Sequence, residues 1–231
     1  MAHFILMLTR DDRTVADALE VYEQVRGASL QHVGFKDIGL PLAQMKALVR
    51  HIRSDARRVM LEVVSTSEEE ELRSVRAAIA LEVDYLLGGR HAARVLPLLE
   101  GTPIRYFPFC GNALGHPTRL QSSIEETVAD ARRLAQLPGV HGLDLLGYRF
   151  SGDAPELIRR VVGAVRLPVI AAGSIDRPER VRAVCAAQVW GFTIGTALFE
   201  GKFSSALLPR QIETLLEIEG VTRPPGPPPL G

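Results

Sequence analysis

The sequence predicts a single α/β domain, a closed (β/α)8 TIM barrel of eight parallel strands. The chain has 231 residues, 46% of them hydrophobic, which suits one domain of barrel size with a large core. Short, nearly continuous apolar runs recur along the chain, as expected of strands buried on both faces, and helical patterns separate them. The connections are short, as in parallel strands joined by covering helices.

The predicted strands are the apolar runs Phe4–Leu8, His32–Phe35, Val59–Val64, Asp84–Leu87, Arg105–Pro108, Gly142–Leu146, Pro168–Ala172 and Trp190–Ile194. The predicted helices are Val15–Gln24, Pro41–Arg53, 68–80, Ala93–Leu99, Ser123–Leu137, Pro155–Val165, a helix opened by Asp176 and Pro178, and Ser205–Glu219. The barrel therefore spans residues 1–220. The proline-rich residues 221–231 are expected to form a flexible tail.

The last two predicted strands both end in small residues. Gly173 and Ser174 follow the seventh strand, and Gly195 and Thr196 follow the eighth. Backbone N–H groups of such residues can approach an anion closely, and barrels often bind phosphate after strands 7 and 8. These four residues are predicted to bind a phosphate group.

Three charged residues interrupt or end apolar strands, where a charge is costly unless it faces the polar upper lumen. Glu62 lies within VMLEVV, Asp144 lies within GLDLL, and Lys36 ends VGFK. Their apolar neighbours have the opposite parity, so the three side chains are expected to point into the barrel. Grouped carboxyl and ammonium groups perturb one another's pKa, which favours proton transfer. An ion-pair network without a catalytic role is the alternative.

Several residues after strands are candidates for binding the rest of a substrate. Arg10, Arg90 and Arg149 follow strand ends and could hold a carboxylate or a second phosphate. His116 lies in the long loop Phe109–Gln121, which is a candidate lid or substrate wall. No His, Asp and Glu spacing indicates a metal site.

The C-terminal stretch AAGSI … IGTALFEGKF resembles the last quarter of the ribulose-phosphate-binding barrels, and its ALFEGKF ending is most similar to the histidine-biosynthesis barrels. The resemblance implies an enzyme of phosphorylated small molecules. The histidine-pathway isomerases carry one catalytic aspartate within strand 1 and another on strand 5. Here Asp11 and Asp12 follow strand 1, and RYFPF has no aspartate. This departure argues against a histidine-pathway isomerase.

The preferred hypothesis is an enzyme that transfers protons in a small phosphorylated metabolite, as an isomerase, an epimerase or a carbon–carbon lyase. The stretch PVIAAGSI also resembles flavin barrels, so an FMN-dependent oxidoreductase is an alternative, although no cofactor is otherwise predicted. A barrel that binds a phosphometabolite without turnover is a third hypothesis. A 4-hydroxythreonine-phosphate dehydrogenase is a remote alternative, because the sequence has no nucleotide fingerprint.

Composition restricts the partners of the protein. The formal net charge is zero, so nothing indicates binding to nucleic acid or to an acidic membrane. No apolar run is long enough to span a bilayer. The two cysteines have no partner motif, which favours a reducing cytoplasm. A phosphorylated small molecule is the expected ligand, and the sequence leaves open whether the protein is a homo-oligomer.

Overall fold

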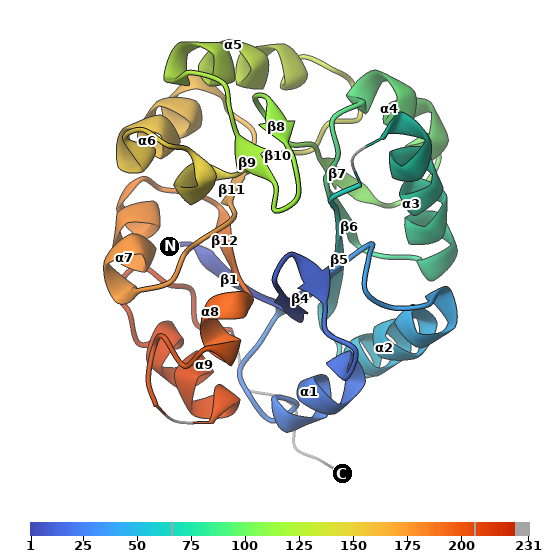
Figure 1. The fold of residues 1–231 in the computed structure, drawn as a ribbon, viewed down its shortest axis with the longest axis vertical. Coiled ribbons are helices and arrows are strands. Elements are labelled where there is room, and N and C mark those ends of the chain that lie inside the picture. The colour runs from blue at the N-terminus through green and yellow to red at the C-terminus, as the bar shows by residue number, and fades with distance from the viewer. Residues whose placement is uncertain (66, 206, 225–231) are drawn as a thin grey trace.

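Eight parallel strands form one sheet that closes on itself, with helices around its outside (Figure 1). The computed structural model describes residues 1–65, 67–205 and 207–224. The strand order is β10-β11-β12-β1-β4-β5-β6-β7. Parallel bridges from Tyr106 to Val140 and from Phe109 to Asp144 join the two ends of this order. The predicted barrel is confirmed.

The strands of the barrel are β1 (His3–Met7), β4 (His32–Lys36), β5 (Arg58–Val63), β6 (Tyr85–Gly88), β7 (Arg105–Phe107), β10 (Leu143–Leu145), β11 (Val169–Ala171) and β12 (Gly191–Ile194). The helices are α1 (Ala18–Gln24), α2 (Leu42–Ser54), α3 (Glu68–Leu81), α4 (Ala92–Leu99), α5 (Ile124–Leu134), α6 (Ala154–Ala164), α7 (Pro178–Ala186), α8 (Thr196–Phe199), α9 (Leu208–Leu216) and the 3₁₀ turn η1 (Gly147–Arg149).

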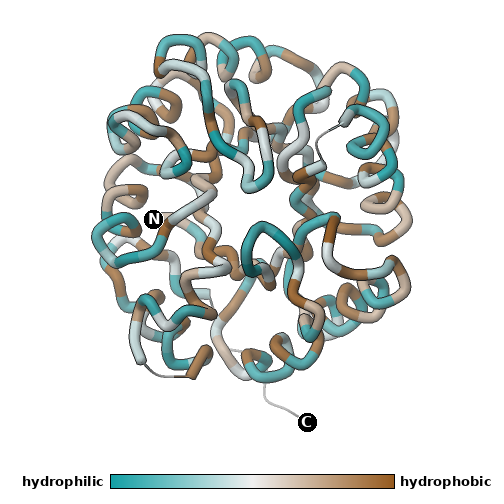
Figure 2. Tube along the Cα trace, viewed as in Figure 1, coloured by the Kyte–Doolittle hydropathy of each residue, from teal (hydrophilic) through white to brown (hydrophobic). Residues whose placement is uncertain are grey.

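Two small hairpins replace segments that the sequence predicts as loops. The first pairs β2 (Thr9–Arg10) with β3 (Arg13–Thr14), and the second pairs β8 (Ala113–Leu114) with β9 (Arg119–Leu120). Figure 1 shows them extending toward the centre of the barrel from opposite sides. Their tips are hydrophilic in Figure 2, whereas much of the strand backbone carries hydrophobic residues.

The apolar residues divide into two cores, as strand parity requires. The larger core fills the space between the strands and the helices and includes Phe4, Leu6, Leu61 and Leu143. The smaller core fills the barrel interior with residues of the other parity: Ile5, Met7, Met60, Tyr85, Leu87, Phe107 and Ile170. The lower lumen is therefore packed, and only its upper end is open to polar chemistry.

Aromatic rings close the N-terminal end of the barrel. Trp190 packs against the rings of His3, His32, Tyr85 and Phe107, with ring centroids 5.0–5.9 Å apart. Burial lowers the pKa of His32 to about 4, so this ring is neutral at physiological pH. His3 and His32 are thus part of the packing at the N-terminal end of the barrel.

Local sequence signals explain several helix boundaries. Ser123 and Glu126 form a capping box at the start of α5, and Ser67 accepts a hydrogen bond from the Glu70 N–H at the start of α3. Helix α1 begins at Ala18 and not at Val15, since the Val15 N–H follows the first hairpin and donates to the Leu8 carbonyl at 3.1 Å.

The first two residues of the predicted tail contact the start of the chain. Val221 is buried and forms a parallel bridge with Ala2, and the Thr222 N–H donates to the Ala2 carbonyl at 2.8 Å. The expected tail therefore does not start at residue 221. Residues 225–231 of that predicted tail lie outside the described residues.

We expect Val221→Ala to lower the free energy of unfolding by about 1–2 kcal/mol, since each buried methyl group contributes about 0.8 kcal/mol. Urea denaturation measures the change. Thr222→Ala is the matched control, because it keeps the backbone N–H that bonds to Ala2. Equal stability of Val221→Ala and the unmodified protein would mean that residue 221 already belongs to the tail.

Candidate active site

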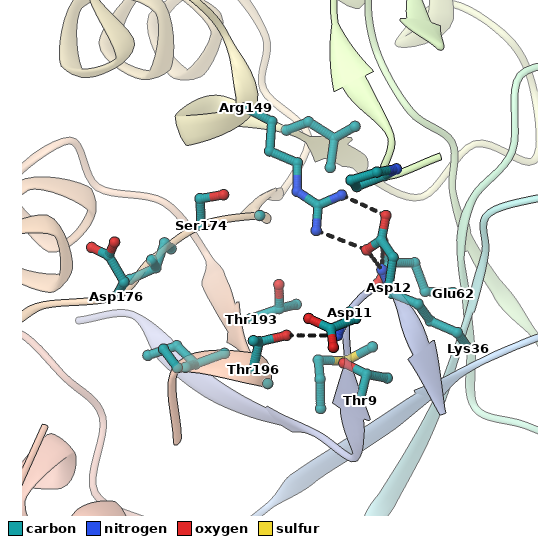
Figure 3. Close-up of a pocket in the computed structure, with 18 of the residues that line it drawn as sticks. Thr9, Asp11, Asp12, Lys36, Glu62, Arg149, Ser174, Asp176, Thr193 and Thr196 are labelled. Carbon is teal, nitrogen blue, oxygen red and sulfur yellow. Dashed lines mark hydrogen bonds and ion pairs between the residues drawn. The ribbon is translucent and has the colours of Figure 1, made fainter. Parts of the chain in front are cut away.

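A cavity of about 500 Å³ opens at the C-terminal end of the barrel, where the polar strand ends meet (Figure 3). One side carries the buried charges Asp12, Lys36 and Glu62 together with Arg149. The other side carries Ser174 and Thr196, which follow β11 and β12. The predicted lumen charges Lys36 and Glu62 and the strand ends predicted to bind phosphate therefore line one cavity.

The carboxylate of Asp12 is the centre of the charged group. Arg149 binds it with two hydrogen bonds, Nη1 to Oδ2 at 2.6 Å and Nη2 to Oδ1 at 2.7 Å. Lys36 Nζ also bonds to Asp12 Oδ1 and lies 3.6 Å from Glu62 Oε1. Although burial alone would raise the pKa of Asp12, its bonds to Arg149 and the Lys36 ammonium lower the pKa far below its ordinary value.

The first hairpin explains how a residue beyond strand β1 reaches the lumen. Asp11 and Asp12 are its two turn residues and have φ angles of 48° and 63°. Asp tolerates this left-handed conformation, which two-residue hairpin turns require. Thr14 fixes the hairpin, since its hydroxyl donates to the Lys36 carbonyl and accepts from the Lys36 N–H. Sequence reasoning noted Asp12 only by position and did not assign it to the site.

Lys36, Glu62 and Asp144 point into the barrel, as strand parity predicts. Burial raises the pKa of Glu62, while the Lys36 ammonium opposes that rise. Asp144 is fully buried, and neither of its carboxyl oxygens has a hydrogen-bond partner among the described residues. Burial therefore raises the pKa of Asp144 well above its ordinary value, and the Glu62 carboxylate raises it further. Asp144 does not line the cavity.

The four predicted phosphate-binding residues lie together at the cavity wall. Ser174 has a φ of 56° and is exposed, and its backbone N–H has no backbone acceptor within the described chain. Thr196 begins α8, so its N–H precedes the first helical hydrogen bond, and its hydroxyl accepts from the Asp11 N–H at 3.1 Å. These groups can donate to an anion that enters the cavity.

Gly195 is required by the close packing of the first hairpin. A Cβ at this position would overlap the Thr9 hydroxyl and lie 2.7 Å from the Thr9 carbonyl. Any side chain here would push the hairpin away from β12. Gly195 therefore shapes the site by letting Thr9 and Asp11 approach the strand end.

Of the four residues predicted to bind the rest of the substrate, Arg149 and His116 line the cavity. Arg10 does not line this cavity. Its guanidinium donates to the Phe199 carbonyl at 3.2 Å and lies over the Phe199 ring, outside the cavity wall. Arg90 does not line this cavity either, because it follows β6 on the far side of the second hairpin.

The second hairpin carries His116 over the cavity and is joined to the buried charges. The Thr118 N–H donates to Asp12 Oδ2 at 3.0 Å, and the Thr118 carbonyl accepts from Arg149 Nη1 at 3.0 Å. The loop predicted as a lid or substrate wall is thus fixed at the turn of the hairpin by the Asp12–Arg149 pair.

Two further findings bear on the site. Within residues 1–65, 67–205 and 207–224, no group of three or more His, Cys, Asp or Glu side chains is placed to hold a metal ion. No helix in the same part of the chain has the length and apolar character needed to cross a membrane.

Comparison with solved structures identifies the fold. Thiamine phosphate pyrophosphorylase from Pyrococcus furiosus superposes with a TM-score of 0.63 at 17% identity and covers 94% of each chain. Orotidine 5'-phosphate decarboxylase from Pyrococcus horikoshii superposes with a TM-score of 0.67 at 14% identity, covering 94% of this chain and 100% of that one. The fold shared with these enzymes is the (β/α)8 barrel. The resemblance predicted from the C-terminal motif is therefore confirmed at the level of fold.

Sequence similarity to curated proteins is local. A phosphoribosyl imidazole-carboxamide isomerase of Halobacterium salinarum is 38% identical over 86 residues, which is 35% of this chain and 35% of that protein. The match thus spans about a third of the length of this relative. No protein-family model matches the sequence. The comparisons therefore show the fold of this chain and a short stretch of sequence similarity.

We expect Asp12→Asn to lower the free energy of unfolding by about 3–5 kcal/mol at neutral pH, because it removes the carboxylate that pairs with the buried Lys36 and the partly buried Arg149. The contribution of Asp12 also depends on pH. Because the folded-state pKa lies below the ordinary value of 3.8, this stability is present above pH 3.8 and is lost as the pH falls toward the folded-state pKa. Asp12→Asn should lack this acid-dependent part.

Urea denaturation at several pH values measures both effects. Asp11→Asn is the matched control, since Asp11 is the exposed neighbour in the same turn and its backbone bond to Thr196 remains. The control should change stability by less than about 0.5 kcal/mol. Equal effects of the two substitutions would contradict the central role of Asp12.

Proposed function

We propose that the protein is an enzyme that transfers a proton at a carbon next to the carbonyl group of a small phosphorylated metabolite. Isomerase, epimerase and carbon–carbon lyase reactions share this chemistry. One observation carries the proposal: a single cavity is lined both by the strand ends predicted to bind an anion and by a buried carboxyl–ammonium pair. Phosphate binding at the strand ends would hold the substrate carbon near Glu62.

Glu62 is the proposed acid–base group. It lines the cavity, and its raised pKa brings the carboxyl closer to neutral pH, where a general base is most effective. Lys36 Nζ, 3.6 Å from Glu62 Oε1, would stabilise the negative charge of an enolate. Asp12 and Arg149 would position Lys36 without contacting the reacting carbon. Asp144, deeper in the lumen, would exchange protons with Glu62.

The cavity wall favours a hydroxylated aliphatic substrate. Thr9, Asp11, Asp176 and Thr193 supply hydroxyl and carboxylate groups that can bond to sugar hydroxyls. Among the described lining residues there is no Phe, Tyr or Trp on which a flat ring could stack. This wall favours a phosphosugar over the isoalloxazine ring of FMN.

The comparisons support the phosphate part of the proposal. A thiamine phosphate pyrophosphorylase and an orotidine 5'-phosphate decarboxylase share the fold, and their names refer to phosphorylated compounds.

Both cysteines are free thiols, Cys110 buried and Cys185 half-buried, in agreement with the proposed reducing cytoplasm.

A thermal-shift screen of phosphorylated sugars, amino-acid phosphates and FMN tests the substrate class. A ligand at about one hundred times its dissociation constant adds roughly 2.7 kcal/mol of stability. Stabilisation by a phosphosugar, followed by solvent-deuterium exchange into it, is the expected outcome. Binding without exchange would favour a non-catalytic barrel, and stabilisation by FMN alone would favour the flavin alternative.

We expect Ser174→Asp to weaken phosphosugar binding about 100-fold or more, since it places a carboxylate where the phosphate is proposed to bind. Asp tolerates the left-handed backbone found at this exposed position. Ser174→Asn is the matched control, because it has a similar size without the charge. Calorimetric titration measures both, and equal affinities of the two variants would argue against this phosphate site.

We expect Glu62→Gln to lower kcat by about 10²–10⁴-fold while leaving ligand affinity and folding largely intact. Glu200→Gln is the control, because Glu200 lines the same cavity but is exposed and pairs with the exposed Lys202. Steady-state kinetics and urea denaturation measure the effects. A large loss of stability with Glu62→Gln would indicate the structural ion-pair network instead.

A further inference from the structure

A second cavity, of about 620 Å³, lies outside the barrel mouth and has its own set of polar side chains. Its wall comes from the loop after β6, the second hairpin region and α5, and includes Arg90, His91, Asn112, Gln121 and Arg133. It shares no lining residue with the candidate active site. The second cavity is therefore a separate location in which to look for a ligand.

His91 is held in one orientation by a buried carboxylate. Glu71 of α3 has a side chain that is 2% exposed and lies 2.7 Å from His91 Nδ1. The same carboxylate accepts the backbone N–H groups of Arg90 and His91 at 3.0 Å. Because an ionised carboxylate only accepts, Nδ1 must carry the hydrogen, and Nε2 remains free for another partner.

The loop after β6 is shaped to admit Glu71. Gly89 has a φ of +75°, and a Cβ there would overlap Glu71 Oε1 and lie 2.9 Å from Glu71 Cδ. Glycine at this position therefore lets the carboxylate reach His91. The histidine side chain itself is 32% exposed, so Nε2 has room for a ligand.

The charges around the second cavity leave Arg90 available. Asp130 binds the Arg133 guanidinium at 2.7 and 2.9 Å, and Glu126 is used in the capping box of α5. Arg90 is exposed, and its guanidinium has no ion pair or hydrogen bond within the part of the chain that the structure describes. An unpaired guanidinium next to an oriented imidazole suits a ligand with several oxygen acceptors.

We infer that this cavity is a second ligand site, which binds the oxyanion of a small carboxylate or phosphate compound through Arg90 and His91. Arg90 would donate two N–H bonds to the anion. His91 Nε2 would donate to the anion when the ring is protonated, or accept from a ligand hydroxyl when it is neutral. The inference does not depend on the proposed function at the barrel mouth.

Proton NMR of the histidine rings, with inorganic phosphate added at constant ionic strength, tests the second site. The His91 resonance, assigned with His91→Asn, should shift and saturate. Arg90→Ala should weaken this response about tenfold or more, which is the usual effect of losing a charged hydrogen-bond donor. Arg94→Ala, a change of an exposed arginine in α4 that does not line the cavity, should leave it unchanged.

Ser174→Asp distinguishes the two sites, because it changes the proposed phosphate site at the barrel mouth and leaves the second cavity intact. The His91 shift should therefore persist in Ser174→Asp. Three results would overturn the inference: a His91 resonance that does not saturate, an unchanged response in Arg90→Ala, or loss of the response in Ser174→Asp. The last result would assign the phosphate effect to the barrel mouth.

Discussion

The Asp12 carboxylate is the contact on which the arrangement of the barrel mouth depends. It joins the first hairpin, the end of β4, the 3₁₀ turn at Arg149 and the second hairpin, which are far apart in the sequence. A buried carboxylate can remain charged here because two cations and a backbone N–H donate hydrogen bonds to its oxygens, and its negative charge in turn offsets the charge of the cations. Removing it would leave Lys36 with the more distant Glu62 carboxylate and would take the Asp12 carboxylate away from Arg149, so these segments depend on one side chain for their relative positions.

The same contact helps to give the three lumen carboxyl groups different pKa values. Asp12 has both cations as direct partners and a lowered pKa, whereas Glu62 has only the more distant Lys36 ammonium and a raised pKa. Asp144 lacks any hydrogen-bond partner among the described residues and favours its neutral form. One small volume therefore holds a permanent anion and two carboxyl groups that resist ionisation, the condition under which carboxyls divide acid and base roles.

How far the sequence could predict this site depended on the kind of signal. Lys36, Glu62 and Asp144 were found because a charge within an apolar strand has a parity that assigns it to the lumen. Asp12 was not, because its position depends on a hairpin turn that brings it back over the strand ends. Arg10 does not line the cavity although Thr9 does, since residues next to each other in a hairpin point to opposite faces. Val221 was assigned to the tail on composition, although its bridge to Ala2 depends on a partner at the other end of the chain.

The second hairpin meets the buried charges only through the main chain of Thr118. The Thr118 hydroxyl has no hydrogen-bond partner among the described residues, so the side chain adds nothing to this contact. Every amino acid except proline offers the same N–H and carbonyl groups. The amino-acid type at position 118 therefore does not reveal its structural role, and any residue except proline could replace Thr118 while the main-chain contact persists. A search for invariant side chains would miss one of the attachments that hold the mouth of this barrel together.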